Sequence, residues 1–377
     1  MTGGKIVTFF TGRRISVAVM AVLAVMTTVE GTWAIGLPYH WTYVAVLILT
    51  VLALGCIVFK NLRAKSYVAL VSHFGLLLAL AGGLLGMVST TSAYLKVFPD
   101  REERVAIDAN GYAVPLPFSI SLTSFDIDCY EDGTSPRQYT STISIDGNEL
   151  TTSVNHPCSY KGYSIYQSDY DTEYGCYSVL KIVRDPWLPL AAIGAILLAV
   201  GAVLGLKTTW NSWRTLLAAL IICAVFAAIS VARINFGTLM PALRSLWFVP
   251  HLAIYMLAYA ILALAVVSGI ASHFTSKLPE GLSNRLLSTA SSLLLLGMLC
   301  GAVWARQAWG EYWTWDAKEC WAAATWLLTI AGTHIGSGRR KLALIFTIVS
   351  FLAMQMTWYG VNWLPSSGQS LHTYNQK

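Results

Sequence analysis

Long apolar segments separated by short polar ones make up most of this chain. A helix that crosses a bilayer needs about 20 mostly apolar residues, because lipid offers no hydrogen bonds to an open backbone. Nine segments have this character and are predicted to be transmembrane helices: 15–35, 42–59, 68–89, 187–206, 215–235, 249–272, 287–305, 318–336 and 342–362. Composition agrees, since 55% of the residues are hydrophobic and only 12% are charged, against about 25% charged residues in soluble proteins.

Basic residues set the expected orientation of these helices. Thirteen lysines and arginines lie in the short loops and helix ends on the side that carries the N-terminus, and five lie in the opposite short loops, helix ends and C-terminal tail, with the long polar stretch 90–184 left out of the count. Because basic residues concentrate in cytoplasmic loops, the N-terminus is predicted to be cytoplasmic and the C-terminus extracytoplasmic. The first apolar segment follows Arg13 and Arg14 without a clear cleavage site, so we expect a retained anchor. The net charge of +6 then reflects topology, and no basic stripe indicates nucleic acid.

One polar stretch, about residues 90–184, separates the third and fourth apolar segments. It contains alternating runs at 118–122 and 141–145, and Asp146-Gly147 follows the second run and precedes a third at 149–154. Asp-Gly between alternating runs is typical of a two-residue β-hairpin. The predicted fold class is therefore an all-α polytopic membrane protein of about nine transmembrane helices with a small β-rich extracytoplasmic domain.

An unusually aromatic segment lies between the seventh and eighth apolar segments, on the outer side. It reads Trp309-Gly310-Glu311-Tyr312-Trp313-Thr314-Trp315-Asp316 and is called the aromatic segment below. Aromatic residues are common at membrane surfaces as interfacial anchors. Three indoles within seven residues also suit a flat, apolar, partly charged ligand, and a tetrapyrrole is the clearest candidate. Both interpretations are open at this point.

Two of the seven histidines share the outer face with the aromatic segment. His251 begins the sixth apolar segment and His372 lies in the C-terminal tail. Neutral imidazoles from two separate elements can supply both axial ligands of a haem iron. The alternative is a pair of interfacial histidines bonded to water or headgroups.

Two further histidines lie in the cytoplasmic leaflet. At the helical rise per residue, His73 is about 8 Å deep in the third segment and His334 about 3 Å deep in the eighth. Ionisable groups inside a membrane are costly, so each is a candidate functional residue. The alternative is that a backbone carbonyl or hydroxyl satisfies each of them separately.

Other polar residues near the aromatic segment have structural interpretations. Asp316-Ala317-Lys318-Glu319 fits a capping box at the start of a helix, a role that does not exclude an aromatic site just before the cap. The outer arginines Arg233, Arg244 and Arg306 suit haem propionates or lipid headgroups equally well.

The seven cysteines include no CxxC motif, which argues against a thiol oxidoreductase and against covalently attached haem in this chain. Three of the seven lie in the outer module and leave room for one disulfide.

The aromatic segment resembles the WWD signature of the haem-handling membrane proteins of cytochrome c maturation. The match covers Trp309, Gly310, Trp313, Trp315 and Asp316. With it, His251 and the histidine of Leu371-His372-Thr373-Tyr374 resemble the two external histidines of the CcsA type, and His334 resembles its membrane-embedded histidine.

The N-terminal half resembles the ResB partner of such proteins. Ser72-His73-Phe74-Gly75 is similar to its histidine-bearing span, and Asn155-His156-Pro157 and Val183-Arg184-Asp185-Pro186 are similar to the end of its outer domain. The whole chain therefore resembles a ResB–CcsA fusion, with ResB-like helices in 1–89, the outer module in 90–184, a final ResB-like helix in 185–210 and a CcsA-like domain in 211–377. It departs from the pattern in its short outer module and in the few spans between this boundary and His251.

This resemblance implies a cytochrome c synthase of a bacterial inner membrane. Haem b would rest between His73 and His334 and then between His251 and His372, against the three tryptophans. The implied partners are an apocytochrome c with a CxxCH motif, a thiol-reducing thioredoxin-like protein and membrane lipid. The alternative function is a haem transporter or chaperone that passes haem to a separate ligase.

Overall fold

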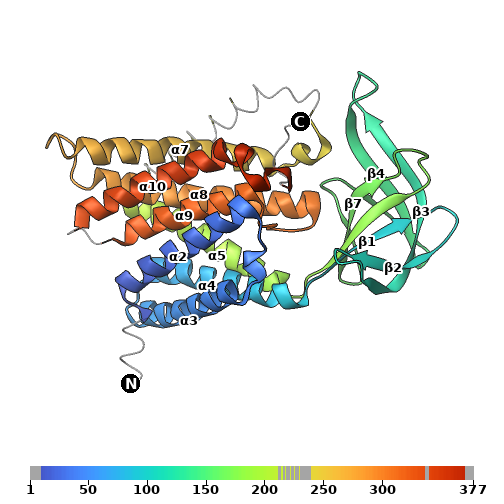
Figure 1. The fold of residues 1–377 in the computed structure, drawn as a ribbon, viewed down its shortest axis with the longest axis horizontal. Coiled ribbons are helices and arrows are strands. Elements are labelled where there is room, and N and C mark those ends of the chain that lie inside the picture. Colours follow the sequence, from blue (N-terminus) through green and yellow to red (C-terminus); the bar gives the residue numbers. More distant parts are fainter. Residues whose placement is uncertain are drawn as a thin grey trace.

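The chain folds into a bundle of long helices with a β module at one end (Figure 1). The computed structural model describes residues 10–210, 239–335 and 339–369 and the single positions 214, 217, 221, 225 and 229. Within these residues, seven helices are long and apolar enough to cross a membrane. They are α2 (Arg13–Trp33), α3 (Trp41–Arg63), α4 (Tyr67–Ser89), α5 (Leu188–Trp210), α7 (Phe248–Ala271), α8 (Leu282–Trp309) and α10 (Arg340–Trp358).

The prediction of about nine spans is confirmed only in part. The eighth predicted span is the helix α9 (Ala317–His334), which has 18 residues but is not among the seven apolar ones. Its first turn carries Lys318 and Glu319, and these charges lower its mean apolarity. The fifth predicted span, 215–235, lies outside the described residues apart from the single positions. The described part of the chain therefore has the character of a multi-pass membrane protein, with seven helices able to cross a bilayer by length and composition.

Glycines let the helices of the N-terminal half pack backbone to backbone. A Cβ added at Gly194 of α5 would lie 2.4 Å from the Ala79 nitrogen of α4, and one at Gly75 would lie 2.7 Å from the Leu198 nitrogen. Small residues at such positions allow the close approach on which helix association in membranes depends. The α4–α5 pair, which carries the β module, is therefore rigidly joined.

The two halves of the chain pack against each other along the bundle. Helix α2 contacts α9, and α5 contacts α8. At the first of these contacts, a Cβ on Gly31 would lie 2.6 Å from the Cys320 Cβ, and the Ser366 hydroxyl donates to the Gly31 carbonyl at 2.6 Å. Ser366 belongs to η6 (Pro365–Gln369). The other short 3-10 helices in the described residues are η1 (Leu37–Tyr39), η3 (Pro241–Arg244) and η5 (Gly360–Trp363).

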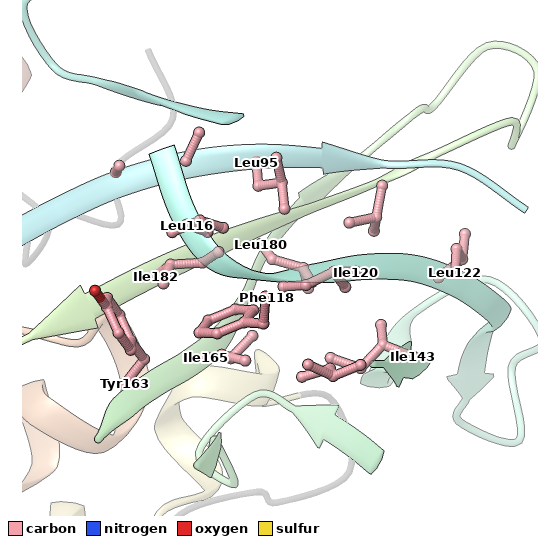
Figure 2. Close-up of a cluster of buried hydrophobic side chains, with 14 residues drawn as sticks. Leu95, Leu116, Phe118, Ile120, Leu122, Ile143, Tyr163, Ile165, Leu180 and Ile182 are labelled. Carbon is pink, nitrogen blue, oxygen red and sulfur yellow. The ribbon is translucent and has the colours of Figure 1, made fainter. Parts of the chain in front are cut away.

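The outer module is one antiparallel sheet of eight strands in the order β5-β4-β3-β2-β1-β8-β7-β6. The strands are β1 (Thr91–Val97), β2 (Glu103–Asp108), β3 (Ala113–Cys129), β4 (Pro136–Ile145), β5 (Asn148–Ser153), β6 (Cys158–Tyr160), β7 (Tyr163–Tyr170) and β8 (Ser178–Arg184). Figure 2 shows its core, where side chains such as Phe118, Ile120, Ile165 and Ile182 point toward one another. Such burial stabilises the module by about 25 cal/mol per Å² of apolar surface.

The predicted hairpin is confirmed. Strands β4 and β5 pair from Ile145 with Asn148, and Asp146 and Gly147 form the two-residue turn at φ 49° and 82°. Positive φ at both turn residues is the type I′ geometry that Asp-Gly favours. The three module cysteines, Cys129, Cys158 and Cys176, are all free, so none of them forms a disulfide in this structure.

Candidate functional site

An aromatic cavity of about 330 Å³ lies at the end of the bundle nearest the β module. Its size falls within the range usual for ligand pockets. Helices α7, α8, α9 and α10 and the aromatic segment all contribute to its wall. The lining residues are Phe248, His251, Leu252, Tyr255, Met256, Tyr259, Met298, Gly301, Ala302, Trp304, Tyr312, Trp313, Lys318, Glu319, Ala322, Thr357 and Trp358.

His251 is held in this wall by α8. Its Nδ1 lies 2.8 Å from the Gly297 carbonyl oxygen, and because a carbonyl only accepts, Nδ1 is the donor. In the neutral ring the lone pair is then on Nε2, which is the nitrogen suited to bind a metal. A Cβ at Gly301 would lie 2.6 Å from His251 Nδ1, so the glycine makes room for the imidazole.

Trp304 also supports His251, with ring centroids 5.8 Å apart. This tryptophan is 2% exposed, and its Nε1 donates to the Ala242 carbonyl at 2.8 Å. Sequence reasoning missed it. A signal was present, because Gly297, Gly301 and Trp304 lie at i, i+4 and i+7 and so share one helix face.

The structure separates the three tryptophans of the aromatic segment. Of these three described tryptophans, Trp313 alone lines the cavity. Trp309 packs on Trp304 at 5.0 Å, one ring away from His251. Trp315 faces the other way, edge-on to Tyr43 of α3 at 5.4 Å.

The backbone explains this divergence. Gly310 ends α8 at φ 82°, where glycine is favoured, and Trp315 has φ 62°, which is uncommon for a bulky residue. The turn at Trp315 places consecutive indoles on different sides of the segment. Burial among the α2 and α3 side chains keeps Trp315 in this conformation.

The predicted helix cap at Asp316 is present. Its carboxylate accepts from the Glu319 amide at 2.8 Å, and Glu319 Oε2 accepts from the Thr314 amide at 2.7 Å. The donor of the second bond, Thr314, lies two residues before the cap residue Asp316. Together these bonds fix the end of the aromatic segment to α9.

One donor in the cavity has no hydrogen-bond partner among the residues that the structure describes. The indole Nε1 of Trp313 is buried and unsatisfied. Buried polar groups are normally paired, so an unpaired donor in a cavity indicates a ligand acceptor. Tyr312, also in the wall, stays neutral, because burial raises the pKa of its hydroxyl and the opposing charge of Arg306 compensates only in part.

The second predicted pair, His73 and His334, lies at the opposite end of the bundle. His73 Nδ1 donates to Ala69 O at 2.7 Å, and His334 Nδ1 donates to Ile330 O at 2.8 Å. In the neutral form both rings therefore carry the lone pair on Nε2, as His251 does. The two imidazoles are close enough to interact electrostatically, although one belongs to α4 and the other to α9. His372, the predicted partner of His251, lies outside the described residues.

The residues present fit a haem. The outer cavity combines an imidazole with its lone pair on Nε2, aromatic walls, an unsatisfied indole donor and the cation Lys318. Within the part of the chain that is described, no three His, Cys, Asp or Glu side chains converge on a site for a bare metal ion. The inner end supplies two imidazoles from two helices, which is the ligand set of a six-coordinate haem iron.

Comparisons with known proteins divide the chain into two regions. Residues 63–176 match the ResB-like family, and residues 187–368 match the cytochrome c assembly protein family. Similar proteins include the cytochrome c biogenesis protein CcsA of Chlamydomonas reinhardtii, 34% identical over 154 residues, which are 36% of this chain and 42% of that protein. The CcsA of Mesostigma viride is 32% identical over 179 residues, 36% of this chain and 57% of the relative.

A third relative has a higher identity over a shorter stretch. The CcsA of Porphyra purpurea is 42% identical over 98 residues, which are 25% of this chain and 30% of that protein. The chain thus spans about half or less of the length of the curated relatives it matches. The two family matches confirm the two-part resemblance read from the residues.

Proposed function

This chain belongs to the cytochrome c biogenesis proteins that join a ResB-like region to a cytochrome c assembly region, and on that premise we propose that it carries haem b across the membrane and attaches it to an apocytochrome c. The observation that carries the proposal is the outer cavity. Its wall contains both His251, whose Nδ1 is bonded to the Gly297 carbonyl, and Trp313, whose buried indole nitrogen has no partner among the described residues.

The inner pair is the proposed first resting place of the haem. His73 comes from the ResB-like region and His334 from the cytochrome c assembly region, so both regions are needed to hold it. With the N-terminus cytoplasmic, as the basic residues predict, this pair faces the cytoplasm and the cavity faces outward. The expected membrane is a bacterial inner membrane.

His251 and His372 are the proposed ligands at the outer site. In this proposal Trp313 contacts the haem directly, whereas Trp309 and Trp315 act indirectly. Trp309 supports Trp304, and Trp315 anchors the segment on Tyr43.

The chemistry requires no nucleophile from this chain. Haem supplies two vinyl groups, and each cysteine thiol of a CxxCH motif adds across one of them. An S–H bond breaks, a C–S bond forms, and the hydrogen ends on the neighbouring vinyl carbon, so no oxidant is consumed. The thiols must arrive reduced, which is the role proposed for a thioredoxin-like partner. The chain contributes position, since holding two reactants in register removes most of the entropic cost of their meeting.

Co-expression with an apocytochrome c, in a host without its own maturation system, tests the proposal. The expected product is a cytochrome with covalently bound haem, detected by haem staining after denaturation. His251→Ala and His372→Ala should abolish the product and weaken outer haem. His73→Ala and His334→Ala should lower haem at both ends.

His273→Ala is the matched control. Its Nδ1 donates to Gly269 O at 3.1 Å, four residues earlier on its own helix, as in His73. This variant should bind haem and form cytochrome with covalently attached haem at wild-type levels. If all four site variants keep the wild-type haem spectrum, the assignment is wrong. A haem-loaded chain that yields no product supports the transporter or chaperone instead.

A further inference from the structure

The β module contacts the aromatic segment directly, at Gly310 and Glu311. Lys181 of β8 forms an ion pair with Glu311, and its side chain is only 9% exposed, against 39% for Glu311. Gly310 lies under β7 and β8, where an added Cβ would be 3.0 Å from the Tyr166 ring and 3.3 Å from Val183. The module therefore packs on the segment through both an ion pair and a close backbone contact.

Arg306 completes this contact from the last turn of α8. Its guanidinium lies 5.4 Å from the ring centroid of Tyr166 and 5.5 Å from that of Tyr312. It also donates to the Gly310 carbonyl, and to the Ser164 hydroxyl at 3.5 Å. One cation thus joins β7, the end of α8 and the aromatic segment. Tyr166, Lys181, Arg306, Gly310 and Glu311 are together called the module contact.

The module contact is adjacent in sequence to the cavity wall. Tyr312 and Trp313, which follow Glu311 directly, both line the cavity. The far end of the segment is fixed by the Asp316 cap and by Trp315 on Tyr43. In the described residues, the near end is fixed by the module contact. A shift of Glu311 therefore moves Tyr312 and Trp313 relative to His251.

The charges make this contact sensitive to substitution. A nearly buried ammonium is stable only with its partner, because removing one member of such a pair leaves an uncompensated charge. Lys181 also lies 5.8 Å from the Tyr94 ring, so its position is fixed from two sides.

We propose that Lys181 is a positioning residue for haem, through which the β module holds the aromatic segment against the outer cavity. This inference rests on the proposed function and deepens it. The ResB-like module then has a defined task in the haem site of the other half, although it contributes no ligand there.

A charge-swap series tests the inference on the full chain in detergent. The variants are Lys181→Glu, Glu311→Lys, the double swap and the milder Glu311→Gln. The readout precedes any attachment: haem bound per chain, and the low-spin bis-imidazole signature of the outer site in resonance Raman spectra. Each single swap should weaken outer haem on the order of 10-fold or more, as outer-shell substitutions at metal sites do. The double swap should recover most of that loss.

Lys161→Glu is the matched control. Lys161 forms an ion pair with Asp146 at 2.9 Å within the same module, and neither residue belongs to the module contact. It should keep wild-type haem binding. If the single swaps keep wild-type outer haem, or if a folded double swap is as defective as the singles, Lys181 does not act by positioning.

The same series separates this inference from the proposed function. If the wild-type chain never binds haem, both the proposed function and the role of Lys181 are refuted. A wild-type chain that binds haem but forms no product ends the attachment proposal, while the swap series still decides the role of Lys181.

Discussion

Gly301→Ala is the sharpest test of how His251 is held. The added Cβ would lie 2.6 Å from His251 Nδ1 and 2.7 Å from Cε1, whereas ordinary contacts begin near 3.4 Å. The imidazole must therefore move by about 0.8 Å or α8 must retreat from α7. Either movement stretches the 2.8 Å bond from Nδ1 to the Gly297 carbonyl.

We expect Gly301→Ala to weaken haem binding at the outer site much more than it destabilises the fold. Replacing a helical glycine with alanine stabilises a helix by about 1 kcal/mol, and overpacking costs about 1–3 kcal/mol. The net change in the free energy of unfolding should therefore be a loss of roughly 0–2 kcal/mol, small enough for the chain to fold. Outer haem affinity should fall by about 10–100-fold, because the ligand loses its orienting bond.

Haem titration of the purified chain, followed by Soret absorbance, measures this affinity. Gly83→Ala is the matched control, since no atom lies within 4 Å of the added Cβ there. Wild-type outer haem affinity in Gly301→Ala would refute the proposed support of His251 by α8.

Three further changes test other parts of the structure. Gly194→Ala places a Cβ 2.4 Å from the Ala79 nitrogen and should lower the thermal midpoint in detergent by an overpacking cost of about 1–3 kcal/mol, whereas Gly83→Ala should not. Asp316→Ala removes the α9 cap and should cost about 1 kcal/mol in the same melt, and an unchanged midpoint would exclude that role. The Lys161 ammonium and the Ser119 amide lower the pKa of Asp146 to about 2, so its stabilisation is present above pH 4 and lost as pH falls toward 2; Asp146→Asn should remove this acid dependence of module fluorescence.

Much of the architecture follows from local patterns in the sequence. Apolar length alone predicts the segments that became α2, α3 and α4. The Asp146-Gly147 turn is set by two residues whose backbone preferences match a type I′ hairpin. The helix cap at Asp316 is also a local feature, so its sequence signature was sufficient.

The site was less predictable, because it depends on contacts between distant residues. The three indoles of the aromatic segment look equivalent in the sequence, but the left-handed backbone at Trp315 turns that ring toward Tyr43. No local rule predicts such a conformation for tryptophan; burial by other helices maintains it. The same holds for Lys181, which looks like an ordinary exposed strand residue until β8 is placed beside Glu311.

The contact of α2 with α9 has a consequence for how the chain is made. About 290 residues separate Gly31 from Cys320, so the ribosome releases α2 long before its neighbour α9 exists. During synthesis the Gly31 face of α2 therefore contacts lipid or a transient partner until the last third of the chain, which contains α9, has been inserted. A late step of assembly is then the packing of α9 onto α2, and His334 can meet His73 only after α9 has been inserted.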